Sequence, residues 1–428
     1  MESKITDKRM YRVLMPCLMG MEALVKAEAI KAGYSQEVLC AEDAQVAILC
    51  SGLDAAKEAV ARMNFRSRFS ERVLLELGNI PAADYNELFE GTRSLPWEAW
   101  IKPGFPIVMK SGSSRRSQIY GIPSCQRIIK KALVQRLLEQ SGLLGGIWPE
   151  DPSKTPYVLQ FSLCDDICSI ALDTTGVALP KRSYRPAQVA APLKETLAAA
   201  ILELSLFPRE FHYGERLWDP CCGSGTFGIE AALMLKDEAP GLQRHFSGEK
   251  NPLIGASVFD REREIAKRSI HEVEGPIALL SDIDPHAVDI ARQNARRAGV
   301  ESLFMFEVAD LRRSRVQSVQ KKLGEKILIV ANPPYGERLS DEKDAGQILK
   351  ALAQLAFERG KLREGVRLSV LSPDKEAERQ IGAKTSKRRK LYNGGISCTM
   401  YHYFCLPTKK KTQRCAIFPW ERETPFRL

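Results

Sequence analysis

The chain is predicted to be an α/β protein whose carboxyl-terminal half forms a doubly wound parallel sheet. Short, fully apolar runs such as Ile327 to Val330 have the composition of buried parallel strands. They alternate with helical patterns, as in the apolar stretch Phe227 to Leu235. Acidic or amide residues follow several of these runs directly. Open sheets of this kind place their ligands at the carboxyl ends of their strands, so these residues are candidates for a binding site.

The amino-terminal portion is predicted to hold smaller α+β units. The 428 residues suggest two or three domains, and a hydrophobic content of 44% can supply a substantial core. The first unit is predicted from five segments: strand Tyr11 to Met15, helix Gly20 to Ala32, strand Glu37 to Leu39, strand Gln45 to Cys50 and helix Leu53 to Met63. A second unit is predicted from four segments: strand Pro106 to Met109, helix Gln126 to Gln140, and closing strands Val158 to Cys164 and Ile167 to Leu172.

A proline-containing connector joins these units to the second sheet. It carries three prolines, Pro180, Pro186 and Pro192, and leads into a helix from Leu193 to Leu204. The sheet begins near Arg216, and its first strand ends at Asp219. After the first helix of the sheet, Pro240 to Phe259 is predicted to be a long surface insertion.

A glycine turn follows the first strand of the sheet, in the sequence Asp219-Pro-Cys-Cys-Gly-Ser-Gly-Thr226. Gly223 and Gly225 permit tight backbone geometry, and the N–H groups at the start of the following helix can face a negative group such as a carboxylate. The dinucleotide pattern is only partly met, and the phosphate-binding lysine of a nucleotide-triphosphate loop is missing. Neither ATP nor NAD is therefore the expected ligand.

Two further strands are predicted to end in acids. Asp282 follows the run Ile277 to Leu280 and is placed to bind ribose hydroxyls, whereas Asp284 precedes Pro285 and is predicted to cap the helix His286 to Ala298. Asp310 follows the strand Phe304 to Ala309. It could accept a hydrogen bond from an adenine amino group, and it is equally consistent with a solvated loop acid.

The segment Asn332-Pro333-Pro334-Tyr335 emerges from the fourth strand. The amide oxygen of Asn332 and the carbonyl of Pro333 form a pair of acceptors suited to an exocyclic amino group, and Tyr335 offers a face on which a base could stack. Asn and Pro are also common turn residues, so a plain strand-ending turn is the alternative.

These motifs resemble a known family. The segments Asp219 to Thr226, Ser281 to Pro285 and Asn332 to Leu339 are similar to class I S-adenosylmethionine-dependent methyltransferases that act on exocyclic amines. More narrowly, with Leu172 to Gly176 and Lys181 to Arg185, they resemble THUMP-containing RNA guanine-N2 methyltransferases of the bacterial large-subunit ribosomal RNA type.

This resemblance implies a Rossmann-like methyltransferase domain at residues 176–428 with a connector helix and a basic tail, preceded by a ferredoxin-like domain at 1–65 and a THUMP RNA-binding domain at 66–175. Further implied are a catalytic Asn332-Pro333-Pro334-Tyr335 segment and S-adenosylmethionine bound by Asp219, Cys222, Gly223, Gly225, Thr226, Asp282, Asp310 and Asn332. Lys194 to Thr196 could close over the cofactor. A transfer RNA guanine-N2 enzyme, an adenine-N6 nucleic-acid enzyme and a non-catalytic RNA-binding factor are the rival hypotheses.

The net charge of +10 is unevenly distributed. Residues through Gly176 carry 21 basic and 21 acidic side chains, yet Ala99 to Leu138 contains eight basic residues and no acid. A strand, a loop and a helix in this stretch could present cations to phosphates. The candidate RNA-binding residues are Arg115, Arg116, Arg127, Lys130 and Lys131, together with Arg388 and Arg389 from a second basic segment. Ribosomal RNA or a ribosome assembly intermediate is the expected partner, and the oligomeric state stays open.

The composition gives no sign of export, membrane insertion or metal binding. No run of eighteen apolar residues and no cleavable leader is visible. The eleven cysteines are odd in number, scattered, and without a second Cys or His pair at zinc-ligand spacing. A cytoplasmic protein with reduced thiols and no metal is expected.

Overall fold

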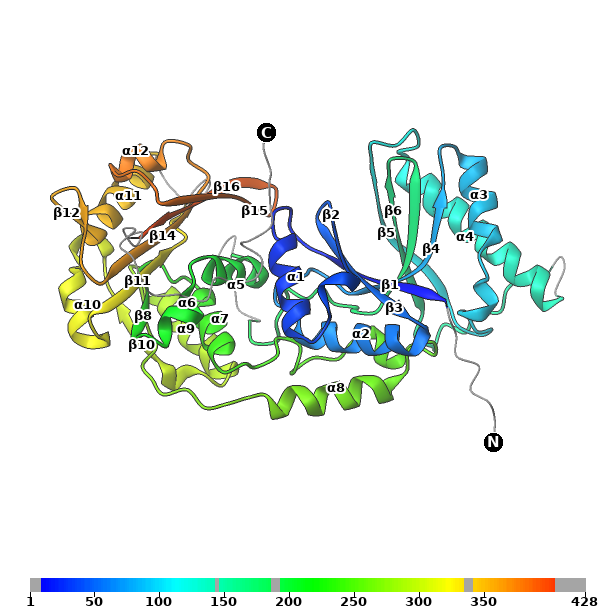
Figure 1. Cartoon of the computed structure of the whole chain (residues 1–428), viewed down its shortest axis with the longest axis horizontal. Helices are drawn as coiled ribbons and strands as arrows, with labels where there is room; N and C mark the ends of the chain where they lie inside the picture. The colour runs from blue at the N-terminus through cyan, green and yellow to red at the C-terminus, as the bar shows by residue number, and fades with distance from the viewer. Residues whose placement is uncertain (1–8, 143–145, 186–192, 335–341, 405–428) are drawn as a thin grey trace.

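The computed structural model describes residues 9–142, 146–185, 193–334 and 342–404 of the chain. The elements form two lobes that lie side by side (Figure 1). The amino-terminal lobe is built on one seven-stranded sheet and the carboxyl-terminal lobe on another, each with helices packed against it. We call the carboxyl-terminal lobe the catalytic lobe, because the family resemblance implies that catalysis takes place there. A small two-stranded ribbon, β12 (Phe357–Glu358) and β13 (Lys361–Leu362), belongs to the second lobe.

The sheet of the amino-terminal lobe has the strand order β2-β3-β1-β4-β7-β6-β5. Its strands are β1 (Met10–Pro16), β2 (Leu39–Glu42), β3 (Gln45–Ser51), β4 (Leu74–Pro81), β5 (Ile107–Arg115), β6 (Tyr157–Cys164) and β7 (Ile167–Asp173). The helices of this lobe are α1 (Glu22–Lys31), α2 (Leu53–Arg66), α3 (Tyr85–Ser94) and α4 (Ile122–Ser141). The succession β1-α1-β2-β3-α2-β4 is the ferredoxin-like arrangement, whose four strands lie together at one end of the sheet.

Strand β4 belongs to both halves of this sheet. Only Leu74 and Leu75 pair with β1, whereas the strand pairs with β7 from Leu74 to Pro81. Backbone hydrogen bonding is therefore continuous across the lobe, and its division at residue 65 stays a prediction. The predicted strand Glu37 to Leu39 is wrong: a 3₁₀ turn (Gln36–Val38) occupies most of it, and β2 starts at Leu39.

The catalytic lobe confirms the predicted doubly wound sheet. Its strand order is β10-β9-β8-β11-β14-β16-β15, in which β10, β9, β8, β11 and β14 are parallel and β16 is antiparallel to both of its neighbours. The strands are β8 (Glu215–Asp219), β9 (Ala278–Asp282), β10 (Phe304–Val308), β11 (Lys326–Ala331), β14 (Val366–Ser372), β15 (Lys387–Asn393) and β16 (Ile396–Tyr403). The helices are α5 (Glu195–Leu204), α6 (Phe207–Phe211), α7 (Thr226–Leu235), α8 (Ala256–Arg268), α9 (Pro285–Arg297), α10 (Val316–Leu323), α11 (Glu342–Ala356) and α12 (Ala377–Ile381).

The apolar strands of this sheet are buried on both faces. In β11, Ile327 and Ile329 belong to a core formed with α10, α11 and α12, whereas Leu328 and Val330 belong to the core on the opposite face. The second core continues into the amino-terminal lobe. This two-sided burial explains why the strand reads as an unbroken apolar run and not as an alternating one.

The stretch from Pro240 to Phe259 is not the surface insertion that the sequence predicts. Phe246 and Phe259 are buried and stack on each other with ring centroids 5.8 Å apart. Both contact Phe65 at the end of α2, with centroid distances of 5.2 and 6.2 Å. Arg62 of α2 also forms a bidentate ion pair with the buried Glu262 of α8. The insertion therefore connects the catalytic lobe to the ferredoxin-like helices, and α8 runs beneath the amino-terminal lobe, alongside α2, in Figure 1.

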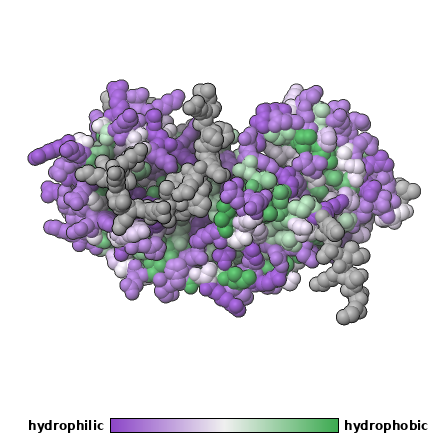
Figure 2. Space-filling view, viewed as in Figure 1, coloured by the Kyte–Doolittle hydropathy of each residue, from purple (hydrophilic) through white to green (hydrophobic). Residues whose placement is uncertain are grey.

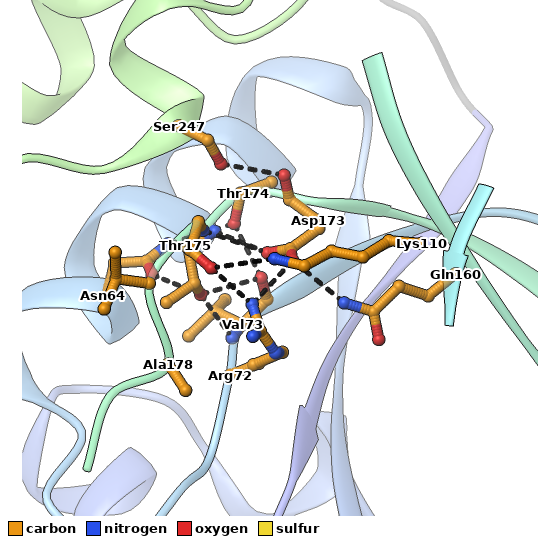
Figure 3. A network of polar contacts seen from close by, with 12 residues as sticks. Asn64, Arg72, Val73, Lys110, Gln160, Asp173, Thr174, Thr175, Ala178 and Ser247 are labelled. Atoms are coloured by element: carbon orange, nitrogen blue, oxygen red, sulfur yellow. Dashed lines mark hydrogen bonds and ion pairs between the residues drawn. The ribbon is translucent and has the colours of Figure 1, made fainter. Parts of the chain in front are cut away.

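A polar network forms the junction between the lobes (Figure 3). The carboxylate of Asp173 at the end of β7 accepts hydrogen bonds from Arg72, from Gln160 and from the backbone N–H groups that follow it. The side-chain amide of Asn64 donates to the hydroxyl of Thr174 at 3.0 Å and accepts a hydrogen bond from the hydroxyl of Thr175 at 2.7 Å. Ser247, in the insertion, donates to the Asp173 carbonyl. The segment Leu172 to Gly176 thus has a structural role, because it joins the amino-terminal lobe to the insertion of the catalytic lobe.

Candidate active site

The carboxyl edge of the catalytic sheet brings four predicted polar residues to neighbouring positions. Asp310, Asp282, Asp219 and Asn332 end or follow β10, β9, β8 and β11, which adjoin one another in this order. Neighbouring strands lie about 4.8 Å apart, so these residues form one continuous row. Doubly wound sheets bind their ligands at this edge.

The turn between β8 and α7 has little steric bulk. Gly223 and Gly225 have φ angles of +50° and +81°, in the left-handed region that favours glycine. A Cβ on Gly225 would lie 3.0 Å from the Cβ of Ala291 on α9. The N–H of Gly225 donates to the carbonyl of Cys222 over 2.8 Å, and Thr226 begins α7. Glycine at these two positions therefore lets the turn pack closely against α9 at the amino end of α7.

Two acids lie beside this turn. Asp282 accepts hydrogen bonds from the backbone N–H groups of Gly223 at 2.9 Å and Asp284 at 3.1 Å. Burial raises the pKa of Asp282, and it raises the pKa of the fully buried Asp219 still more, with a further contribution from the charge of Asp282. Two desolvated carboxylates at one site favour a cationic ligand, because its charge would offset theirs. Asp284 caps α9 through the N–H of His286, as the sequence predicts.

Ile283 is a residue of this edge that sequence reasoning missed. Its side chain is 58% exposed between the two aspartates Asp282 and Asp284. An exposed aliphatic side chain next to the ribose-binding candidate offers an apolar surface to a flat ring. The signal in the sequence is a large apolar residue between two acids, Asp282 and Asp284, at the end of a predicted strand.

Asp310 lies at the predicted edge but already has an internal partner. Its two carboxylate oxygens accept hydrogen bonds from the guanidinium of Arg312 at 2.8 to 3.1 Å, and one of them also accepts the backbone N–H of Arg312 at 3.0 Å. This pairing lowers the pKa of Asp310. The contact of Asp310 with an adenine amino group stays a prediction.

Asn332 carries an unused acceptor at this edge. Its Oδ1 is buried and makes no hydrogen bond within the described part of the chain. Pro333 is buried and Pro334 half-buried, which fixes the backbone on either side of the Pro333 carbonyl. A buried acceptor without a partner costs about 1–3 kcal/mol, so a donor supplied by a ligand would remove this penalty. Tyr335 lies outside the described residues, and its stacking role stays a prediction.

Arg185 is a second residue that sequence reasoning did not assign to the site. Its buried guanidinium donates to the hydroxyl of Thr226 and to the carbonyl of Leu193, both at 2.8 Å, and its Nε lies 3.1 Å from Glu195. It therefore braces the start of α7 from the connector. Lys194 and Thr196 instead contact Glu71 of the amino-terminal lobe, so in this structure their side chains join the two lobes.

Within the predicted RNA-binding stretch, two of the candidate cations already lie near acids. Arg116 pairs with Asp165 at 2.8 Å and with Asp43 at 3.3 Å, and these acids raise its pKa. Lys130 lies 3.5 Å from Glu150. Folding thus brings in acids that the linear run from Ala99 to Leu138 does not contain.

The remaining candidates make weaker contacts. Arg115 donates to a backbone carbonyl, Arg127 contacts Ser124, and Lys131 lies over the ring of Phe89. In the second basic segment, Arg388 pairs with Glu378 at 3.2 Å, whereas Arg389 donates to the carbonyl of Gly20 in the amino-terminal lobe. RNA binding by these residues stays a prediction, with Arg389 also serving as a contact between lobes.

Comparison with known families identifies the chain. Residues 182–402 match the RMKL-like methyltransferase domain, and residues 12–74 match the RlmL ferredoxin-like domain. The chain belongs to the RMKL-like methyltransferase family. It is 35% identical to "Putative RNA methyltransferase YpsC" of Bacillus subtilis (strain 168), over 94% of this chain and 99% of that protein.

Other members of the family are longer. The chain is 31% identical over 354 residues to "Ribosomal RNA large subunit methyltransferase K/L" of Syntrophotalea carbinolica, and the match covers 81% of this chain. It spans only 48% of that relative's length, so this methyltransferase corresponds to about half of the K/L protein.

Two crystal structures share the whole fold. A "possible methylase" from Clostridium difficile 630 has a TM-score of 0.82 and 32% identity, and the match covers 95% of this chain and all of that chain. SMU.472, crystallised with S-adenosylhomocysteine, has a TM-score of 0.79 and 29% identity, with 94% and 100% coverage. This methyltransferase uses S-adenosylmethionine, of which S-adenosylhomocysteine is the demethylated product.

The residues at the sheet edge fit this cofactor. S-adenosylmethionine carries a positive sulfonium and an ammonium group, which suit the desolvated Asp219 and Asp282. The glycine turn leads into the amino end of α7 at this edge, and the N–H groups at the start of a helix can bind a carboxylate. Among the described residues, no helix is long and apolar enough to cross a membrane, and no group of three His, Cys, Asp or Glu side chains could hold a metal ion.

Proposed function

We propose that this methyltransferase transfers a methyl group to the exocyclic N2 amine of a guanine in large-subunit ribosomal RNA. The observation that carries the proposal is the Oδ1 of Asn332 at the carboxyl end of β11, which is buried and has no hydrogen-bond partner among the described residues. An exocyclic amine has two N–H donors and can satisfy this acceptor. The names of the K/L relatives supply the ribosomal RNA part of the proposal.

The chemical task of Asn332 follows from the electronic structure of the amine. The lone pair of an aromatic amine is delocalised into the ring, which makes the nitrogen a poor nucleophile. Hydrogen bonds from its two N–H groups to Asn332 Oδ1 and the Pro333 carbonyl hold the nitrogen in one orientation and favour localisation of the lone pair. Because both acceptors are fixed before the reaction, they need no reorganisation during it.

S-adenosylmethionine supplies an electrophilic methyl group when it is bound. Asp282 is proposed to accept hydrogen bonds from the ribose hydroxyls, and Asp219 with the Cys222 to Thr226 turn to surround the methionine portion. Ile283 would pack against the adenine ring, and the carboxylate of Asp310 would accept a hydrogen bond from the adenine amino group. Arg185 keeps the start of α7 in place through Thr226. These residues bind and orient, and none of them has to act as a general base for the transfer to begin.

The target guanine has to leave its stack or helix in order to reach Asn332. Tyr335 is proposed to stack on the extruded base, which is worth about 1–3 kcal/mol for an aromatic platform. The amino-terminal lobe, with its ferredoxin-like and proposed THUMP parts, would hold the surrounding RNA. The junction at Asp173, which joins the two lobes, would then determine how far the RNA contacts of the amino-terminal lobe lie from the site of methyl transfer.

The experiment is nucleoside mass spectrometry of RNA from a strain that lacks this protein. We expect one N2-methylguanosine to be missing from large-subunit ribosomal RNA and to return when the wild-type chain, but not Asn332→Ala, is expressed. Loss of N2-methylguanosine from transfer RNA would show that transfer RNA, and not ribosomal RNA, is the substrate. Loss of N6-methyladenosine would show that adenine, and not guanine, is the target base. Unchanged RNA of every class would contradict the proposal.

A further inference from the structure

A basic hollow lies on the catalytic lobe beyond the end of β14. It has a volume of about 500 Å³ and is lined by Lys375, Glu378, Arg379, Gly382, Ala383 and Lys384. These residues belong to α12 and to the turns on either side of it. The surface over α12, at the upper left of the molecule, is mainly hydrophilic (Figure 2).

The cations of this hollow are poorly compensated. Lys375, Arg379 and Lys384 are all exposed. Arg379 has one contact, at 3.4 Å, with the exposed Glu376, and pairs of this kind contribute little. Within the described ranges, Lys375 and Lys384 make no ion pair. This differs from the amino-terminal basic stretch, where Arg116 has two acidic partners.

The acid that lines the hollow is directed elsewhere. Glu378 accepts the N–H and hydroxyl of Thr385 at 2.7 and 2.9 Å and pairs with Arg388 at 3.2 Å. The hydrogen bonds from Thr385 lower the pKa of Glu378, and the charges of Arg388 and Lys384 lower it further, so Glu378 offsets part of the charge of Lys384. The turn that follows α12 has small residues, Gly382 and Ala383, and a Cβ on Gly382 would meet nothing within 4 Å. The surface between the three cations is therefore open at this turn, and a phosphate can reach their side chains; the N–H of Gly382 itself is already used, since it donates to the carbonyls of Glu378 and Arg379.

The hollow adjoins the proposed site of methyl transfer. Strand β14 pairs in parallel with β11, and Val370 is aligned with Ala331, one residue before Asn332. Strand spacing and chain length then place Lys375 at most about 27 Å from Asn332. In addition, α12 packs on α11, the helix that follows the acceptor segment in the chain. A strand of RNA whose base occupies the site would carry its neighbouring phosphates into this region.

We propose that Lys375, Arg379 and Lys384 form a phosphate-binding subsite for the RNA strand that flanks the target nucleotide. The inference rests on the proposed function and adds to it the surface that holds the substrate next to the extruded base. Phosphate contacts of this kind position a strand without reading its sequence. These contacts should therefore contribute to RNA affinity in a salt-dependent way and should not affect cofactor affinity.

The test uses the full chain and unmodified large-subunit ribosomal RNA from the deletion strain. The variant Lys375→Gln/Arg379→Gln/Lys384→Gln is compared with wild type by RNA binding at several salt concentrations and by single-turnover methyl transfer. Loss of three phosphate contacts should make the slope of log K against log salt shallower by about 2 and weaken binding at least tenfold at low salt. The RNA concentration for half-maximal rate should rise, while the maximal rate stays within about twofold.

The matched control removes the same charge at the opposite edge of the sheet. Arg297, Lys321 and Lys361 are exposed and precede the amino ends of β10, β11 and β14. The variant Arg297→Gln/Lys321→Gln/Lys361→Gln should keep the wild-type salt slope. Equal S-adenosylhomocysteine affinity in all three proteins would show that the two variants are folded.

The outcomes separate this inference from the proposed function. Suppose that the wild-type protein methylates its RNA, and that the hollow variant has the wild-type salt slope and the wild-type RNA concentration for half-maximal rate. That result would overturn the subsite alone. Equal losses in the hollow and control variants would also overturn it, since only net charge would then matter. A wild-type protein that methylates no RNA would instead overturn the proposed function.

Discussion

The ribose-binding role of Asp282 can be measured separately from its structural role. The structure shows why a simple substitution is ambiguous: Asp282 also holds Gly223 and Asp284 through their N–H groups. Replacement by alanine would therefore loosen the glycine turn as well as remove the ribose contact. A double-mutant cycle isolates the second effect, with S-adenosylhomocysteine and its 2′,3′-dideoxy analogue as the two ligands and wild type and Asp282→Ala as the two proteins.

The expected coupling follows from the chemistry of the contact. A hydrogen bond to an ionised carboxylate contributes about 1.5–3 kcal/mol, which corresponds to roughly a 10- to 150-fold change in affinity. Wild type should prefer S-adenosylhomocysteine over the dideoxy analogue by at least this factor. Asp282→Ala should bind both ligands weakly and nearly equally. The loosened turn affects both ligands alike, so it cancels in the comparison.

Isothermal titration calorimetry supplies the four affinities, and Asp284→Ala is the matched control. Asp284 caps α9, so its loss should cost about 1 kcal/mol of stability but leave the preference for the ribose hydroxyls intact. A coupling near zero for Asp282, or an equal coupling for Asp284, would refute the assignment.

Three further predictions concern the framework of the site. Gly225→Ala places a Cβ 3.0 Å from a neighbouring helix at φ +81° and should weaken cofactor binding at least tenfold by calorimetry, whereas Gly299→Ala, at φ +69° with open space, should destabilise the fold by about 1–2 kcal/mol and leave affinity unchanged. Burial raises the pKa of Glu28 to about 7, so the folded state binds the extra proton and stability falls as pH rises from about 4.5 to 7. Glu28→Gln should remove this dependence, on the order of 1–3 kcal/mol, in urea unfolding between pH 5 and 7.5, and an unchanged pH profile would contradict it. Phe259→Ala should cost about 3–5 kcal/mol and separate the unfolding of the two lobes in calorimetry, whereas Phe357→Ala, within the catalytic lobe, should destabilise it without separating them.

The doubly wound class of the catalytic sheet and the residues at its strand ends could be predicted because the signals are local. Ile277 to Leu280 and Ile327 to Val330 are unbroken apolar runs, and Asp282 and Asn332 follow from where they end. Asp219 was found from the glycine turn that comes directly after it. The capping role of Asp284 was equally predictable, since an acid before Pro285 has few other uses. Such features depend on residues within one strand and one turn.

The errors come from contacts between distant segments. The insertion was expected at the surface, yet Phe246 and Phe259 are buried against Phe65 of the other lobe. The basic stretch was judged from its own residues, whereas the acids that pair with Arg116 come from other strands and loops. A linear reading has no access to either kind of partner.

Methyl transfer by Asn332→Ala tests the central claim most directly. The claim is that the Oδ1 of Asn332, which has no partner among the residues that the structure describes, accepts a hydrogen bond from the target amine as the reaction proceeds. Single-turnover assays on unmodified large-subunit ribosomal RNA, with saturating cofactor, should show transfer at least roughly a hundredfold slower than wild type, with S-adenosylhomocysteine and RNA affinities nearly unchanged. Transfer at the wild-type rate would mean that Asn332 to Pro334 is only a strand-ending turn.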